Sequence, residues 1–229
     1  RVSLYNTYFI MIINWLGQSC FKFQDKINGR EMILVVDPFD PSYIGLKLPT
    51  NLSADIVAVT HDHRDHNFSQ GVHGWSHIID TAGEYEIGGI CIDAIDSYHD
   101  TQKGKERGSN LIFRLEFSDL TVTHLGDLGH LLEPSQLERI SGTDILMIPV
   151  GGHYTIDGKQ AVEVINQVEP KMVIPMHYQL PGLKFELDSL ENFIKAIGLS
   201  PMSSESRLKI SRCDLDSENI QLMILTPSL

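Results

Sequence analysis

The chain has 229 residues, of which 42% are hydrophobic and 21% are charged, and its formal net charge is −12. This composition is ordinary for a folded globular enzyme and excludes fibrous and low-complexity classes. The negative charge repels phosphate backbones, so we expect no nucleic-acid partner.

The chain opens with an apolar run at residues 8–16, which is too short to span a membrane, so we expect no membrane partner. Met11 has the features of a native start, so residues 1–10 are predicted to be an upstream extension and residues 11–229 one domain. The three cysteines are widely spaced and odd in number, which favours a reducing, cytoplasmic location. The sequence leaves open whether the chain forms a homo-oligomer.

The first elements are predicted to be strands, because short apolar runs alternate with breaks that contain glycine or asparagine. They cover residues 12–16, 20–24 and 32–36, and the pair Asn28-Gly29 is a strong turn signal. The third strand ends at Asp37-Pro38, since proline cannot donate to a sheet. Residues 38–53 contain three prolines and are predicted to be loop.

A buried strand at residues 54–60 leads into Thr60-His61-Asp62-His63-Arg64-Asp65-His66-Asn67. Three histidines and two aspartates at this spacing are unusual for a surface loop. Imidazoles and carboxylates together suit Zn²⁺, Mn²⁺ or Fe²⁺ better than Ca²⁺ or Mg²⁺. The motif therefore predicts a metal site. One helical turn is expected within residues 67–75.

The next elements are further strands that end near polar residues. A short strand at 78–80 precedes two strands joined at Gly88-Gly89, the second of which runs on toward His99. Residues 100–109 are polar and aperiodic, so a flexible loop that covers substrate is expected there. A hairpin at 110–117 and 120–125 ends at Gly126-Asp127.

The C-terminal part alternates helices and strands. Helices are predicted at 135–140, after Asp157, and at 187–197, with strands at 144–150 and 171–175. Asp157 and Gln160 form a capping-box pattern, followed by an apolar stripe at Ala161, Val164, Ile165 and Val168. The tail, 208–213 and 220–225, is predicted to be a closing hairpin.

Four further strand ends each carry one candidate polar group: Asp37, His99, Asp127 and His177. Taken singly, each has an ordinary explanation as a turn or loop residue. Ligands from several segments that meet at one sheet edge would form a metal site. We assign no role to His73, His77, His124 or His130, and expect His124 to be structural.

These segments resemble the metallo-β-lactamase superfamily from about Trp15 to Ile197, through the histidine motif, Trp15-Leu16-Gly17-Gln18-Ser19-Cys20-Phe21, Gly126-Asp127 and Ile174-Pro175-Met176-His177-Tyr178. The resemblance implies an α/β (α+β) fold, a four-layer αββα sandwich. It is strongest to a branch of Zn-dependent hydrolases related to ascorbate-6-phosphate lactonase, whose members often have histidine where Gln18 stands. Class B lactamases usually lack the aspartate at position 127, so lactam hydrolysis is not expected.

The resemblance also implies a site for two divalent metal ions, zinc before manganese or iron. His61, His63 and His99 match the ligands of the first ion, and Asp65, His66 and His177 those of the second. Asp127 matches the bridging carboxylate, and Asp37 the buried aspartate that supports the histidine loop.

The expected function is hydrolysis of a small ester, lactone or phosphoester by metal-activated water, with Asp65 orienting the nucleophile and moving its proton. His153 and Tyr154 are candidates for substrate contact. A non-haem iron oxidoreductase on the same fold is the alternative, and an RNA-processing nuclease or a non-catalytic descendant ranks lower.

Overall fold

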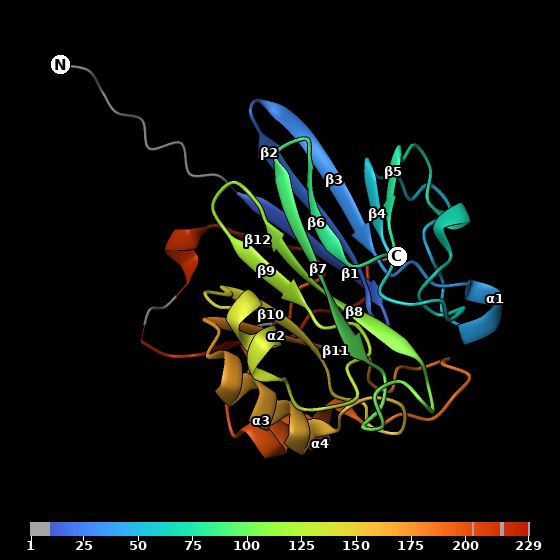
Figure 1. The fold of residues 1–229 in the computed structure, drawn as a ribbon, viewed down its shortest axis with the longest axis vertical. Coiled ribbons are helices and arrows are strands. Elements are labelled where there is room, and N and C mark those ends of the chain that lie inside the picture. The colour runs from blue at the N-terminus through green and yellow to red at the C-terminus, as the bar shows by residue number, and fades with distance from the viewer. Residues whose placement is uncertain (1–9, 203, 216–217, 229) are drawn as a thin grey trace.

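Two β-sheets pack face to face in the computed structural model, which describes residues 10–202, 204–215 and 218–228 (Figure 1). The first sheet has the order β12-β1-β2-β3-β4-β5 and the second β13-β11-β10-β9-β8-β7-β6. The strands of the first sheet are β1 (Met11–Gly17), β2 (Cys20–Ile27), β3 (Arg30–Val36), β4 (Ile56–Ala58), β5 (His77–Ile79) and β12 (Leu208–Ile210). Those of the second are β6 (Gly83–Ile87), β7 (Ile90–Tyr98), β8 (Ser109–Glu116), β9 (Thr121–His124), β10 (Ile145–Pro149), β11 (Met172–Met176) and β13 (Gln221–Leu222).

The meander predicted at the start of the chain is confirmed as β1, β2 and β3, which pair antiparallel. Asn28 and Gly29 make the tight turn between β2 and β3, both with positive φ. The hairpin of β8 and β9 and the glycine turn between β6 and β7 are also confirmed.

The first sheet is apolar on both faces. Side chains alternate across a strand, so neighbouring apolar residues point to opposite faces. Trp15, Phe21 and Leu34 face the core between the sheets. Leu16 and Val35, one position away, join a second apolar cluster on the outer face. That cluster explains why the outer face must be covered.

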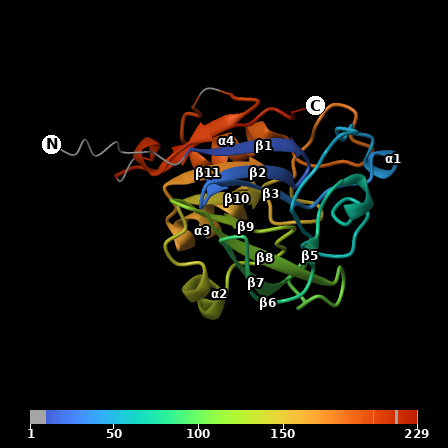
Figure 2. The same ribbon diagram turned by 90° about the horizontal axis from the view of Figure 1, so that it is seen from above.

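Helices cover the outer faces of both sheets, as expected for the four-layer sandwich (Figure 2). On the second sheet α3 (Gly158–Val168) packs against β10, and α4 (Leu190–Ile197) packs against α3. The predicted capping box is confirmed, since Asp157 accepts from the backbone N–H of Gln160 at 2.9 Å. The helix α2 (Pro134–Arg139) lies near β7, where Arg139 pairs with Asp93. The layer over the first sheet is thin, consisting of α1 (Pro41–Ile44), a 3₁₀ turn at Ser69–Gly71 and loops.

Three sequence expectations need correction. Residues 38–53 are not all loop, because Asp40 caps the single-turn helix α1, with Pro41 in its first turn. The last helix begins at Leu190 rather than at 187. The tail is not a hairpin: β12 pairs antiparallel with β1, whereas β13 pairs parallel with β11 in the other sheet. Each tail strand satisfies the open edge of a different sheet.

The expected extension at residues 1–10 lies outside the described residues except for Ile10. Within the part of the chain that the structure describes, no helix is long and apolar enough to cross a membrane.

Candidate metal centre

The predicted ligands come from strand ends of both sheets. The strand β4 leads into the histidine loop of the first sheet, and β3 ends directly before Asp37. In the second sheet, β7 ends before His99 and β11 before His177, while Asp127 follows β9 by three residues. The residues that follow these strand ends gather into two groups. The strand ends therefore lie close together.

The two groups contain all seven metal ligands that the resemblance implies. His61, His63 and His99 form the first group. Asp65, His66, Asp127 and His177 form the second. Within each group, one ligand atom from every residue lies within 4.8 Å of the others. This arrangement could hold two metal ions, one in each group.

Asp127 lies where the two groups meet. Its Oδ2 is 3.2 Å from the Nε2 atoms of three histidines, His66, His99 and His177. His99 belongs to the first group and the other two to the second. The carboxylate therefore contacts histidines of both groups.

Asp37 supports the histidine loop through hydrogen bonds to Thr60 and His66. It is fully buried, and its Oδ1 accepts from the backbone N–H of Thr60 at 2.8 Å. Its Oδ2 lies 2.9 Å from His66 Nδ1 and accepts from the Thr60 hydroxyl at 2.8 Å. The same hydroxyl oxygen is 3.0 Å from His61 Nδ1. Two candidate ligands are thus held through Nδ1, and their Nε2 atoms face away from the support.

The histidines have the unpartnered nitrogens that a metal site requires. His61 Nε2 is buried and finds no hydrogen-bond partner among the described residues. The same is true of Nε2 in His66. Buried imidazole nitrogens without a partner are costly in a metal-free protein, so the donor set fits divalent cations.

The charges in the site also favour a cation. Burial alone would lower the pKa of His66, but the negative charges of Asp127, Asp65 and Asp37 raise it well above its ordinary value. Burial lowers the pKa of His61, which keeps that imidazole neutral and able to act as a ligand. The region thus stabilises positive charge next to neutral nitrogen donors.

Two supporting residues, Asn110 and Ser19, were not identified in the sequence. Asn110 Oδ1 accepts from the backbone N–H of Asp127 at 2.9 Å. The Ser19 hydroxyl donates to Asp127 Oδ1 at 3.3 Å, and Ser19 O lies 2.8 Å from His124 Nε2. The expectation that His124 is structural is consistent with this position. No spacing signal marks these residues: Asn110 meets Asp127 from the paired strand β8, and Ser19 meets it from the other sheet.

Gln18 stands where the resembling family often has histidine. It is fully buried, and its backbone carbonyl accepts from the backbone N–H of His177 at 3.2 Å and from Trp15 Nε1 at 2.8 Å. The side-chain amide has no hydrogen-bond partner in the described part of the chain. The Gln18 backbone therefore helps to position a candidate ligand.

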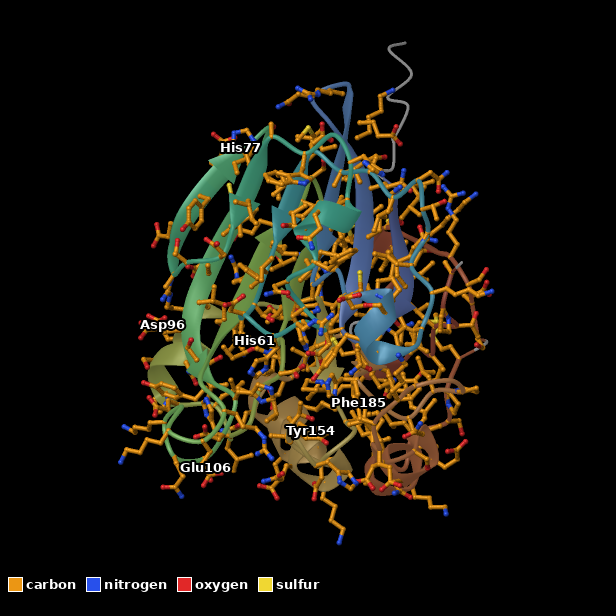
Figure 3. All side chains as sticks on the ribbon, turned by 90° about the vertical axis from the view of Figure 1, so that its right-hand side faces the viewer. His61, His77, Asp96, Glu106, Tyr154 and Phe185 are labelled. Atoms are coloured by element: carbon orange, nitrogen blue, oxygen red, sulfur yellow. The ribbon has the colours of Figure 1, made fainter. Side chains whose placement is uncertain are left out.

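A cavity of about 450 Å³ opens over both groups. It is lined by the candidate ligands His63, Asp65, His99, Asp127 and His177 and by Tyr43, Asp62, Arg64, Glu106, Arg107, Tyr154 and Phe185. Tyr154 lines the cavity as expected for substrate contact, and Figure 3 shows it near Phe185. His153 does not line it: this exposed residue is in a turn with positive φ, and its carbonyl oxygen accepts from Arg107. His77 lies at the opposite end of the molecule (Figure 3).

The polar loop at 100–109 is held by hydrogen bonds, which the sequence did not predict. Asp100 Oδ1 accepts from the backbone N–H groups of Gln102 and Gly104, and Oδ2 from those of Glu106 and Arg107. Burial would raise the pKa of Asp100, but these four donors lower it below its ordinary value. One carboxylate thus shapes the loop that brings Glu106 and Arg107 to the cavity.

Comparisons with known proteins agree with the fold. A model of the beta-lactamase superfamily domain matches residues 12–177. A "UPF0173 metal-dependent hydrolase" of Staphylothermus marinus is 29% identical over 73% of this chain and 83% of its own length. Another, of Carboxydothermus hydrogenoformans, is 26% identical over 83% of this chain and 95% of its own length.

A solved structure from Thermotoga maritima, assigned as a Zn-dependent hydrolase of the metallo-β-lactamase superfamily, is 34% identical. It superposes with a TM-score of 0.71 and covers 94% of this chain and 100% of its own. The chain therefore belongs to the metallo-β-lactamase superfamily, in a branch whose relatives are metal-dependent hydrolases.

Proposed function

We propose that this metal-dependent hydrolase uses two divalent ions, most readily zinc, to cleave a small ester, lactone or phosphoester. The observation that carries the proposal is the pair of ligand groups that meet at Asp127. His61, His63 and His99 would hold one ion, and Asp65, His66 and His177 the other, with Asp127 shared. When bound, such a pair lowers the pKa of a water molecule and polarises the oxygen of the scissile bond.

Asp65 is the residue on this chain placed to move the proton. Its side chain is 15% exposed, whereas that of Asp127 is 2% exposed, so Asp65 faces the cavity more openly. Burial would raise the pKa of Asp65, but the neighbouring His66 lowers it well below its ordinary value, so the carboxylate is ionised. The water oxygen would attack the carbonyl carbon or the phosphorus as Asp65 accepts the proton. The proton would pass to the leaving oxygen as its bond breaks.

The size of the cavity supports a small-molecule substrate, since about 450 Å³ lies within the range of ligand pockets. The net charge of −12 argues against a nucleic-acid substrate. Cys20, Cys91 and Cys213 are all free, which supports our proposal of a reducing, cytoplasmic compartment.

Elemental analysis of the protein purified without chelator, as wild type and as Asp127→Ala, tests the proposed function. We expect about two equivalents of zinc or manganese in the wild type, because two ligand groups are present. We expect less in the variant, since both groups contact Asp127.

Asp62→Ala is the matched control, because Asp62 is in the same loop but in neither ligand group. It should keep the metal content of the wild type. Iron with a visible absorption band would instead favour the alternative oxidoreductase. A wild type that holds no metal after reconstitution would refute the proposal.

A further inference from the structure

Arg107 brings a positive charge to the cavity without an acidic partner. Across residues 10–202, 204–215 and 218–228, no carboxylate lies within ion-pairing distance of its guanidinium, including that of the adjacent Glu106. The guanidinium donates to the His153 carbonyl oxygen at 3.1 Å. That neutral acceptor leaves both the positive charge and further N–H donors available.

The loop geometry holds Arg107 in place. Its backbone N–H donates to Asp100 Oδ2 at 2.8 Å, and Asp100 directly follows the candidate ligand His99. The Arg107 side chain lies over the ring of Tyr154, 5.4 Å from the ring centroid. Contacts from both ends of the residue thus keep the guanidinium at the cavity wall, which lowers the entropy lost on binding a ligand.

The wall beside Arg107 is aromatic. Tyr154 and Phe185 both line the cavity, and their rings meet edge to face with centroids 6.0 Å apart. Both rings lie at the end of the molecule toward which the loop of Glu106 extends (Figure 3). This wall suits an apolar or ring-shaped body next to a negative group.

Arg64, the other cavity arginine, differs from Arg107. It forms an ion pair with Asp40 at 2.5 Å and stacks over Tyr43 at 4.9 Å. Its side chain is 62% exposed. Because Asp40 neutralises it locally, Arg107 is the better anchor for an anion.

We propose that Arg107 is a specificity residue that binds an anionic group of the substrate, a carboxylate or a phosphate, while Tyr154 and Phe185 contact an apolar part beside it. This inference deepens the proposed function and depends on it for the position of the reacting bond. A planar guanidinium binds either anion through paired hydrogen bonds. Preferred substrates would then carry a negative group in addition to the bond that is cleaved.

Binding of three small probes tests the role of Arg107. Phenylphosphonate (which has no ester bond to cleave), benzoate and benzyl alcohol share one ring and differ in charge. Each is titrated calorimetrically into zinc-loaded and metal-free protein, as wild type and as Arg107→Gln, with the zinc content of each sample measured. In zinc-loaded protein we expect at least one anion to bind about tenfold more weakly to the variant, since a charge-assisted hydrogen bond is lost. Benzyl alcohol should bind equally to both.

Two further variants control the measurement. Arg139→Gln removes an arginine that pairs with Asp93 away from the cavity, and it should bind every probe as the wild type does. Arg107→Lys keeps the charge but not the planar fork, so it should recover part of the affinity. The anion with the larger loss in Arg107→Gln identifies the preferred group.

The outcomes separate this inference from the proposed function. Equal binding of both anions by wild type and Arg107→Gln, at equal zinc content, overturns the role of Arg107 even if hydrolysis is found. An Arg107-dependent loss of anion binding in a protein that hydrolyses no ester, lactone or phosphoester supports the anion site and removes the proposed function. If zinc is not retained, the metal-free titrations decide by the same comparison.

Discussion

Gly126 shows how closely the residues around Asp127 are packed. Its φ is +57°, and a Cβ atom there would lie 2.3 Å from Asn110 Oδ1 and 2.9 Å from Thr60 Cβ. Asn110 and Thr60 contact the candidate ligands Asp127 and His61, respectively. We expect Gly126→Ala to lower the free energy of unfolding by about 2–4 kcal/mol, through backbone strain and overpacking. Urea denaturation measures the loss.

Gly142→Ala separates these two contributions. Gly142 also has positive φ, at +77°, but a Cβ atom there would meet no described atom within 4 Å. The control should therefore cost only about 1 kcal/mol, from backbone strain alone. Equal losses in the two variants would show that the crowding around Gly126 has no energetic effect.

Asp37 should control metal affinity without binding the metal. In Asp37→Asn the amide nitrogen would replace an acceptor that faces His66 Nδ1 and the Thr60 hydroxyl. Loss of such support typically lowers metal affinity 10–100-fold. Competition of the purified protein with a zinc chelator measures this affinity.

Asp25→Asn is the matched variant, because Asp25 is also buried and accepts from two backbone N–H groups, of Lys26 and Ser118. It should lower stability and leave zinc affinity unchanged. A similar zinc affinity in Asp37→Asn and wild type would mean that the buried carboxylate does not orient the ligands.

At the scale of elements, α1 depends on one carboxylate. The Ser42 hydroxyl donates to Asp40, and with the Arg64 guanidinium it lowers the pKa of Asp40 from 3.8 to about 2. Because the pKa is lower in the folded protein, this carboxylate contributes stability above about pH 4, and that contribution is lost as pH falls through 2. A ¹³C NMR titration of the Asp40 carboxyl should have its midpoint near 2.

Two variants assign the causes of this shift. Ser42→Ala should raise the midpoint of Asp40 more than Arg64→Gln does, since the serine hydrogen bond has the larger effect. An Asp40 carboxyl that titrates near its ordinary value in the wild type would show that neither contact persists in solution.

Elements with a local cause were predictable. The turn at Asn28-Gly29, the capping box of α3 and the hairpin of β8 and β9 each depend on residues close in sequence. The single turn of α1 was hidden among prolines, although its cap, Asp40 before Pro41, was a readable signal. The destinations of β12 and β13 had no local signal, because a strand's partner depends on which sheet edge is open.

For the whole molecule, metal binding should add to stability, because the candidate ligands join the two sheets. At a metal concentration 100 times the dissociation constant the gain is about 2.7 kcal/mol. We therefore expect a chelator to lower the Tm by about 5–10 °C in calorimetry. The Tm of Asp127→Ala should change little on chelation. An equal decrease in both proteins would argue against a metal that bridges the sheets.

The amino-acid sequence by itself determined most strands and helices and the ligand candidates, because periodicity, caps and the closely spaced histidine motif are local properties. The fold class was implied by the family resemblance. The metal roles and the single-domain boundary stay predictions. Only the tertiary structure decided that Asn110 and Ser19 support Asp127, and that Arg107 rather than His153 faces the cavity. Ser19 and Asp127 are far apart in the chain and follow strands of different sheets, so their contact exists only once both sheets have packed and the loops at their ends meet.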